Sequence, residues 1–167
     1  MFRSTKQKRL SYIVFSVYLF LLVWLVLFKF ATSISDIPSI RGINLIPFYY
    51  DQETRAHFTE VLYNIVVFVP LGVYIQIFGA RWKPVTKIVF VFLVSFLFEV
   101  VQFIFAIGAS DITDIMGNTL GGIIGILFCV MMKKIAPKRF ISIINVFGMS
   151  IEVTAIGILT LLLWANG

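Results

Sequence analysis

Five long apolar runs, separated by short polar segments, dominate the sequence. They cover residues 10–30, 61–79, 88–107, 115–132 and 140–164. Each is close to the length of about 20 residues that an α-helix needs to cross the roughly 30 Å hydrocarbon core of a bilayer. The pattern therefore predicts an all-α integral membrane protein, a bundle of five transmembrane helices that forms a single membrane domain over residues 1–167.

Composition supports this class. Hydrophobic residues make up 60% of the chain, charged residues only 13%, and the mean hydropathy is +1.00. These values lie outside the range of soluble globular proteins. The first run follows the basic segment "MFRSTKQKR", as in a signal peptide, but it is too long and too aromatic for the apolar region of one. We expect it to remain as the first helix.

The lysines and arginines are distributed unevenly between the two sides of the predicted bundle. Arg41 and Arg55 lie in the segments on one side, with Lys29 at the end of the first run. The other side holds eleven: Arg3, Lys6, Lys8, Arg9, Arg81, Lys83, Lys87, Lys133, Lys134, Lys138 and Arg139. Because cationic loops stay in the cytoplasm, we expect a cytoplasmic amino terminus and an external carboxyl terminus. Contact with anionic membrane lipids explains the net charge of +6, so a nucleic-acid partner has no support.

Three features outside the polar cluster have simple interpretations. The segment 31–60, on the predicted outer side, contains "NLIPFYY" and is either an interfacial loop or a lid over a pocket. Cys129 lies within the fourth run and is expected to be a small buried hydrophobic residue. His57 is expected to be a solvated surface residue.

Polar residues interrupt the third and fourth runs in "FEVVQFIFAIGASDITDIMGNTLGGIIG". Glu99 lies about eight residues, on the order of 12 Å, below the outer end of its helix. Residues at similar depth are Asn64 near the outer end of the second run, Gln102 three residues after Glu99, and the i, i+3, i+7 series Asp111, Asp114 and Asn118. An ionised carboxylate at the bilayer centre costs about 2.5 to 3.5 kcal/mol. We therefore expect these groups to face one another or a water-filled cavity. Asn64, Glu99, Asp114 and Asn118 are expected to converge in one outward-facing cavity.

A purely structural interpretation accounts for some of these residues. Asp111 would cap the fourth helix, Asp114 would complement its positive end, and Asn118 would make an interhelical hydrogen bond. Glu99 is harder to explain, because none of the runs offers it a lysine or arginine at its depth. In this interpretation it would be a protonated, hydrogen-bonded acid.

Glycines recur every four residues in the fourth run, at Gly117, Gly121 and Gly125. A face of this kind lets a neighbouring helix backbone approach closely. We expect it to serve helix packing, either within the chain or in a homodimer.

Four segments carry a family resemblance: "NLIPF" from Asn44, "NIVVFVPLG" from Asn64, "EVVQ" from Glu99 and "DITDIMGNTLGGIIG" from Asp111. In order and spacing, residues 40–132 resemble the VanZ-like membrane proteins. The resemblance implies a small helical protein of the plasma membrane of Gram-positive bacteria, associated with low-level resistance to teicoplanin and related lipid-bearing glycopeptides. Residues 133–167 form an additional carboxyl-terminal span outside the resemblance, so Glu152 receives no role from it.

One departure from the family pattern concerns charge. The family often has an arginine shortly before the first aspartate of the last segment, where this sequence has Gly108, Ala109 and Ser110. The carboxylates are therefore expected to be less neutralised here.

Two functions from different classes are compatible with these residues. In the first, the protein is not an enzyme, and an outward-facing pocket binds a lipid-linked wall precursor or the lipid tail of the drug. The predicted ligand-binding residues are Asn44, Asn64, Glu99, Gln102, Asp111, Asp114 and Asn118. In the second, the protein is an intramembrane hydrolase or transferase that acts on a lipid-linked substrate, with Glu99 and Asp114 as acid and base or as ligands of a divalent cation. A plain structural bundle is the third interpretation.

The residue types limit the chemistry. An all-oxygen set suits Mg²⁺ or Ca²⁺ rather than zinc, but nothing in the sequence requires a metal, and we predict no cofactor. No histidine, arginine or lysine is expected within the cluster to hold a phosphate, and Ser110 lacks an obvious activating base. The expected absence of these catalytic groups favours a binding function over catalysis.

Overall fold

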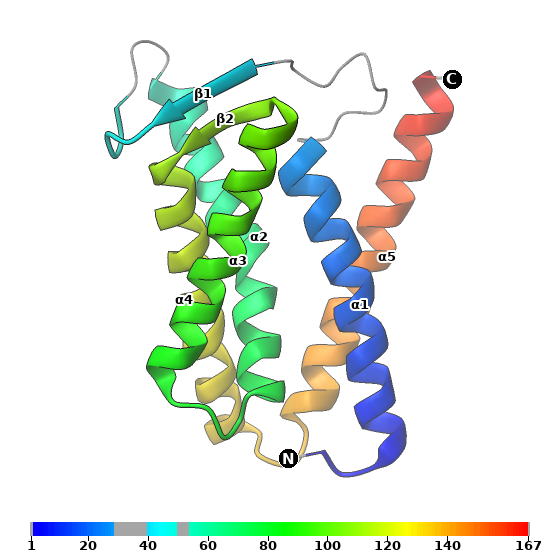
Figure 1. The fold of residues 1–167 in the computed structure, drawn as a ribbon. Helices are drawn as coiled ribbons and strands as arrows, with labels where there is room; N and C mark the ends of the chain where they lie inside the picture. Colours follow the sequence, from blue (N-terminus) through cyan, green and yellow to red (C-terminus); the bar gives the residue numbers. More distant parts are fainter. Residues whose placement is uncertain (1, 29–39, 50–53, 167) are drawn as a thin grey trace.

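The computed structural model describes residues 2–28, 40–49 and 54–166, which form five long helices and two short strands (Figure 1). In chain order the elements are α1 (Thr5–Phe28), β1 (Ile40–Asn44), α2 (Thr54–Phe78), α3 (Pro84–Phe105), β2 (Ile107–Asp111), α4 (Ile112–Ile135) and α5 (Phe140–Asn166). All five helices are long and apolar enough to cross a membrane. The predicted bundle of five transmembrane helices is confirmed.

The helices α1 to α4 begin before the predicted apolar runs, because hydropathy marks only the part that crosses hydrocarbon, whereas α3 ends two residues before its run was expected to end. α3 begins at Pro84, since proline is well suited to the first turn of a helix. It ends at Phe105, where Ala106 takes the left-handed conformation with φ 55°. The predicted end of the first span at residue 30, and residues 31–39 and 50–53 of the segment considered as a loop or lid, lie outside the described residues.

The two strands were not predicted. β1 and β2 pair in parallel, in register from Ile40 with Ile107 to Asn44 with Asp111. They lie at the end of the bundle opposite to the amino terminus, here called the strand end (Figure 1). Five-residue strands carry too little alternation to be recognised in an apolar sequence, and this pairing joins segments far apart in the chain.

The closest helix pair is α2 and α4, and glycines make it possible. A Cβ added at Gly121 would overlap the carbonyl of Ile65, and one added at Gly125 would overlap the carbonyl of Val69. From the α2 side, a Cβ at Gly72 would overlap the carbonyl of Gly122. The glycine face of α4 is therefore occupied by α2 of the same chain and is not available to a second copy.

Apolar side chains fill the interior and also cover the outside. Near the amino-terminal end, Cys129 packs with Val14, Ile77 and Phe140, and its exposure of 1% agrees with the small buried residue expected. Around α3 and α5, many large apolar side chains are exposed, which suits helices that face lipid. α5 packs mainly along α1, where Ser11 Oγ donates a hydrogen bond to Asn145 Oδ1 at 3.0 Å.

Candidate functional site

A cavity of about 310 Å³ lies among α1, α2, α3 and α4 near the strand end. We call it the polar cavity; its lining residues are Leu25, Val26, Thr59, Glu60, Tyr63, Asn64, Glu99, Gln102, Asp114 and Asn118. Five of the seven residues expected to bind a ligand are among them. The four that were expected to converge, Asn64, Glu99, Asp114 and Asn118, all line this one space.

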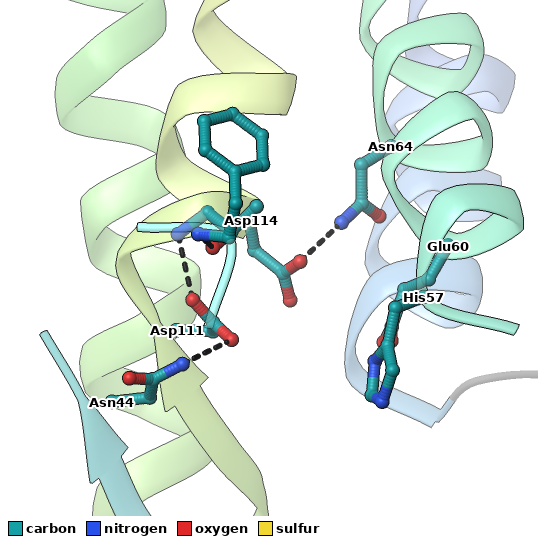
Figure 2. A network of polar contacts seen from close by, with 8 residues as sticks. Asn44, His57, Glu60, Asn64, Asp111 and Asp114 are labelled. Atoms are coloured by element: carbon teal, nitrogen blue, oxygen red, sulfur yellow. Dashed lines mark hydrogen bonds and ion pairs between the residues drawn. The ribbon is translucent and has the colours of Figure 1, made fainter. Parts of the chain in front are cut away.

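Asp114 and Asn64 join the two central helices across the polar cavity. Asn64 Nδ2 donates to Asp114 Oδ1 at 2.7 Å, and Figure 2 shows the two side chains pointing toward each other from α2 and α4. Asp114 lies in the first turn of α4, where the positive end of the helix dipole favours a carboxylate. Its location therefore serves the helix as well as the cavity.

Glu99 is buried, with 4% of its surface exposed. Its Oε2 accepts the backbone N–H of Asp111 at 2.9 Å, and its backbone carbonyl accepts the hydroxyl of Ser110 at 2.8 Å. These two hydrogen bonds attach α3 to the end of β2 and to the residue that caps α4. Because the Ser110 hydroxyl donates to a backbone carbonyl, the structure gives this serine no activating base.

Gln102 and Asn118 lie deep in the wall, each only 1% exposed. Gln102 Nε2 donates to Val26 O on α1 at 3.0 Å, and Asn118 Nδ2 donates to Ser95 Oγ on α3 at 2.9 Å. Their amide oxygens, Gln102 Oε1 and Asn118 Oδ1, are buried without a hydrogen-bond partner among the described residues. The interhelical hydrogen bond expected of Asn118 is present.

Asp111 and Asn44 do not line the polar cavity. Asp111 caps α4, with its Oδ1 accepting the N–H of Thr113 at 2.7 Å, while its Oδ2 accepts Asn44 Nδ2 at 3.0 Å (Figure 2). The single stripe expected of Asp111, Asp114 and Asn118 is wrong, because Asp111 has extended backbone angles of −123° and 127°. Helical spacing does not apply to a residue outside the helix.

A second, larger space, here called the apolar groove, lies beside the polar cavity and has a volume of about 680 Å³. Its walls come from β1, α3, β2 and α4, and they are mostly apolar, with Phe92, Phe96, Phe103, Ile115, Leu120 and Ile123 among them. Asn44, Asp111 and Glu99 line it near the strand end. Glu99 therefore belongs to both spaces.

Sequence reasoning missed three side chains of the polar cavity on α2, those of Thr59, Glu60 and Tyr63. The second span was drawn from residue 61, and Glu60 was assigned to the loop. Its i, i+4 spacing from Asn64 was the signal that could have placed it on the same helix face. His57, expected to be solvated, is partly exposed, and its Nδ1 lies 3.9 Å from Glu60 Oε2.

Three of the ten described residues that line the polar cavity are acidic, Glu60, Glu99 and Asp114, and none of those ten is lysine or arginine. β2 carries no arginine before Asp111, but Arg41 of β1 lies opposite Gly108 and donates through Nη2 to the carbonyl of Ile104 at 3.1 Å. Among the described residues, no group of three histidine, cysteine, aspartate or glutamate side chains is arranged to hold a metal ion.

Comparison with known proteins places this arrangement in a family. The VanZ/LLP1 family model matches residues 15–133. The chain is 36% identical over 144 residues to Protein VanZ of Enterococcus faecium, an alignment that covers 84% of this chain and 87% of that protein. No solved structure matches the chain.

Proposed function

The chain belongs to the VanZ/LLP1 family of membrane proteins, and we propose that it binds an amphiphile, with the polar part at the polar cavity and the apolar part in the apolar groove. The ligand would be a lipid-linked cell-wall precursor or the lipid-bearing drug itself. Binding would reduce access of teicoplanin-type glycopeptides to their target and so lower susceptibility to them.

The observation that supports this proposal most is that Glu99 lines both spaces. An amphiphile needs a polar group and an apolar chain to be accommodated side by side. The apolar groove has a volume within the range of about 300 to 1,000 Å³ typical of small-molecule sites, and its apolar walls suit an acyl or prenyl chain. The polar cavity beside it, lined by carboxylate and amide side chains, suits a headgroup.

A matched pair of tryptophan substitutions on α4 tests the apolar groove. Leu120→Trp should fill the groove, where Leu120 is a lining residue, and should return teicoplanin susceptibility to that of cells without the protein. Leu127→Trp, also exposed on α4 but outside the groove, should leave susceptibility unchanged. Equal resistance in both variants at equal membrane levels would exclude the groove from function.

The orientation in the membrane is part of the proposal. Eleven lysines and arginines belong to segments at the end opposite to the strand end, so the positive-inside rule places the strand end, with both spaces, outside. A wall precursor or drug at the outer surface would then reach them directly.

Cysteine labelling tests this orientation. Ala109→Cys, exposed on β2, should react with a membrane-impermeant maleimide in intact cells. Ala80→Cys, exposed in the connection between α2 and α3, should react only after lysis. The native Cys129 is buried and provides a low background. The reverse labelling pattern would place the proposed site on the cytoplasmic side.

The enzymatic alternative draws on the same carboxylates. Glu99 and Asp114 would have to act as acid and base, although one oxygen of each already accepts a hydrogen bond that holds the fold, from Asp111 N and Asn64 Nδ2. The described residues offer no three-ligand metal set, and Ser110 is directed at a carbonyl. Binding is therefore the function that the geometry supports better.

A further inference from the structure

A turn at the strand end presents apolar side chains to its surroundings. It follows β1 and consists of residues Ile46–Tyr49, here called the apolar turn, in which Tyr49 N donates to Ile46 O at 3.3 Å. The exposed fractions are 71% for Leu45, 59% for Ile46, 57% for Phe48 and 53% for Tyr49. No residue from Gly42 to Tyr49 is charged. Exposed apolar patches of this kind mark contact with a membrane or another protein.

Phe48 has an unusual backbone conformation for its residue type. Its φ of 57° lies in the left-handed region, which residues with a Cβ rarely adopt. Phe48 follows Pro47 and occupies the third position of the turn, where a positive φ usually goes with glycine or asparagine. The sequence thus has a large apolar side chain, more than half exposed, where the backbone favours glycine. In water, neither the conformation nor the exposure would be favourable.

Hydrogen bonds fix the apolar turn to the start of α4. Phe48 N donates to Oγ1 of Thr113, a residue that is only 1% exposed, at 3.1 Å. Ile46 N donates to Asn44 Oδ1 at 3.1 Å. Asn44 in turn donates to Asp111, the cap of α4. The exposed side chains are therefore held in place by buried and capping residues, which is what a fixed contact surface requires.

The end of α3 indicates that lipid reaches the level of β1. Ile104 and Phe105, the last two residues of α3, are 59% and 69% exposed. Arg41 of β1 donates through Nη2 to Ile104 O at 3.1 Å, so β1 lies beside this apolar end. The boundary between headgroups and acyl chains favours tyrosine and tryptophan rings and also takes up phenylalanine and leucine.

We propose that the apolar turn is a membrane anchor, which lies at the boundary between headgroups and acyl chains of the leaflet at the strand end. Burial of the Phe48 ring in lipid would compensate for the positive φ of this residue. Leu45, directly before the turn, lines the apolar groove. The anchor would therefore hold β1 as a fixed wall of the groove and not as a movable lid. This contact with lipid would exist whatever ligand the groove binds.

Nitroxide labels on the full-length protein in liposomes test where the apolar turn lies. Ile46→Cys places the label in the turn, Lys138→Cys places it in water between α4 and α5, and Val153→Cys places it in hydrocarbon midway along α5; all three residues are exposed. The native Cys129 is buried and should remain unlabelled. Oxygen concentrates among acyl chains, whereas a nickel chelate stays in water. The ratio of oxygen to nickel collision rates should be several-fold higher at Ile46 than at Lys138, and highest at Val153.

Two results would overturn the anchor. A ratio at Ile46 equal to that at Lys138 would place the apolar turn in water. Low collision rates with both reagents at Ile46 would indicate that protein, such as a second copy of the chain, covers the turn instead of lipid.

Replacements of Phe48 test whether its ring is the anchoring group. With the label at Ile46, Phe48→Gly should lower the collision ratio toward that at Lys138. Glycine adopts a positive φ without strain and keeps the N–H that donates to Thr113, so the melting temperature should not fall. Phe48→Trp should retain the ratio, because tryptophan also favours the membrane boundary. An unchanged ratio in folded Phe48→Gly protein would mean that the ring does not hold the turn in lipid, and the anchor would be rejected.

Discussion

Gly121→Ala should strongly reduce the amount of folded protein in the membrane, and Gly121→Val should abolish it. The added Cβ would overlap the backbone carbonyl of Ile65 on α2, which cannot move aside as a flexible side chain could. Overpacking of a close contact costs about 1 to 3 kcal/mol, and more where backbone must shift. Because α2 and α4 carry most of the polar cavity, separating them would also remove the proposed site.

Two other glycines provide controls for this prediction. A Cβ at Gly117, one turn earlier on α4, would lie 3.5 Å from the carbonyl of Val61, an ordinary contact, so Gly117→Ala should be tolerated. A Cβ at Gly157 of α5 would meet nothing within 4 Å, so Gly157→Ala should also be tolerated. Membrane levels and melting temperatures of the purified variants measure the effect. Equal melting of Gly121→Ala and Gly117→Ala would show that the helices are less closely packed.

Part of the site could be predicted from the sequence because helical geometry is regular. Counting residues from the ends of the apolar runs gave the depth of Asn64, Glu99 and Asn118, and the short connection between two runs made α3 and α4 antiparallel neighbours. The depth of each residue in the membrane, the helix face on which it lies and the adjacency of the helices were together sufficient to predict that these side chains share one cavity. No long-range pairing had to be known.

The strand pairing and the apolar groove could not be predicted, because they depend on contacts between segments that are far apart in the sequence. The pairing of β1 with β2 places Asn44 beside Asp111, and both residues then belong to the wall of the apolar groove and not to the polar cavity. The groove itself was not recognised, because its apolar lining residues have the same composition as a lipid-facing surface. Only the packing of α3 against α4 beneath the strands distinguishes the two.

Neutral replacements of the two acids should eliminate resistance without affecting folding. In Glu99→Gln and Asp114→Asn the carbonyl oxygen of the amide can still accept from Asp111 N and from Asn64 Nδ2, so both hydrogen bonds that hold the helices are kept. A neutral amide is also cheaper to hold in a membrane than a carboxylate. If negative charge recruits the ligand, teicoplanin susceptibility should rise to that of cells without the protein, at unchanged membrane levels.

Alanine at the same positions should affect stability as well. Glu99→Ala leaves the N–H of Asp111 without its acceptor, and Asp114→Ala leaves the amide of Asn64 without one, so each should cost about 1 to 3 kcal/mol and lower the melting temperature. Glu152→Gln serves as the control for removal of a buried carboxyl elsewhere, with resistance and melting temperature expected to stay at wild-type values. Measuring teicoplanin susceptibility together with the membrane level of each variant distinguishes the effect of lost negative charge from the effect of lost folded protein. Full resistance in the double amide variant would mean that Glu99 and Asp114 act only as hydrogen-bond acceptors between helices, and the acid-base and divalent-cation interpretations would both be rejected.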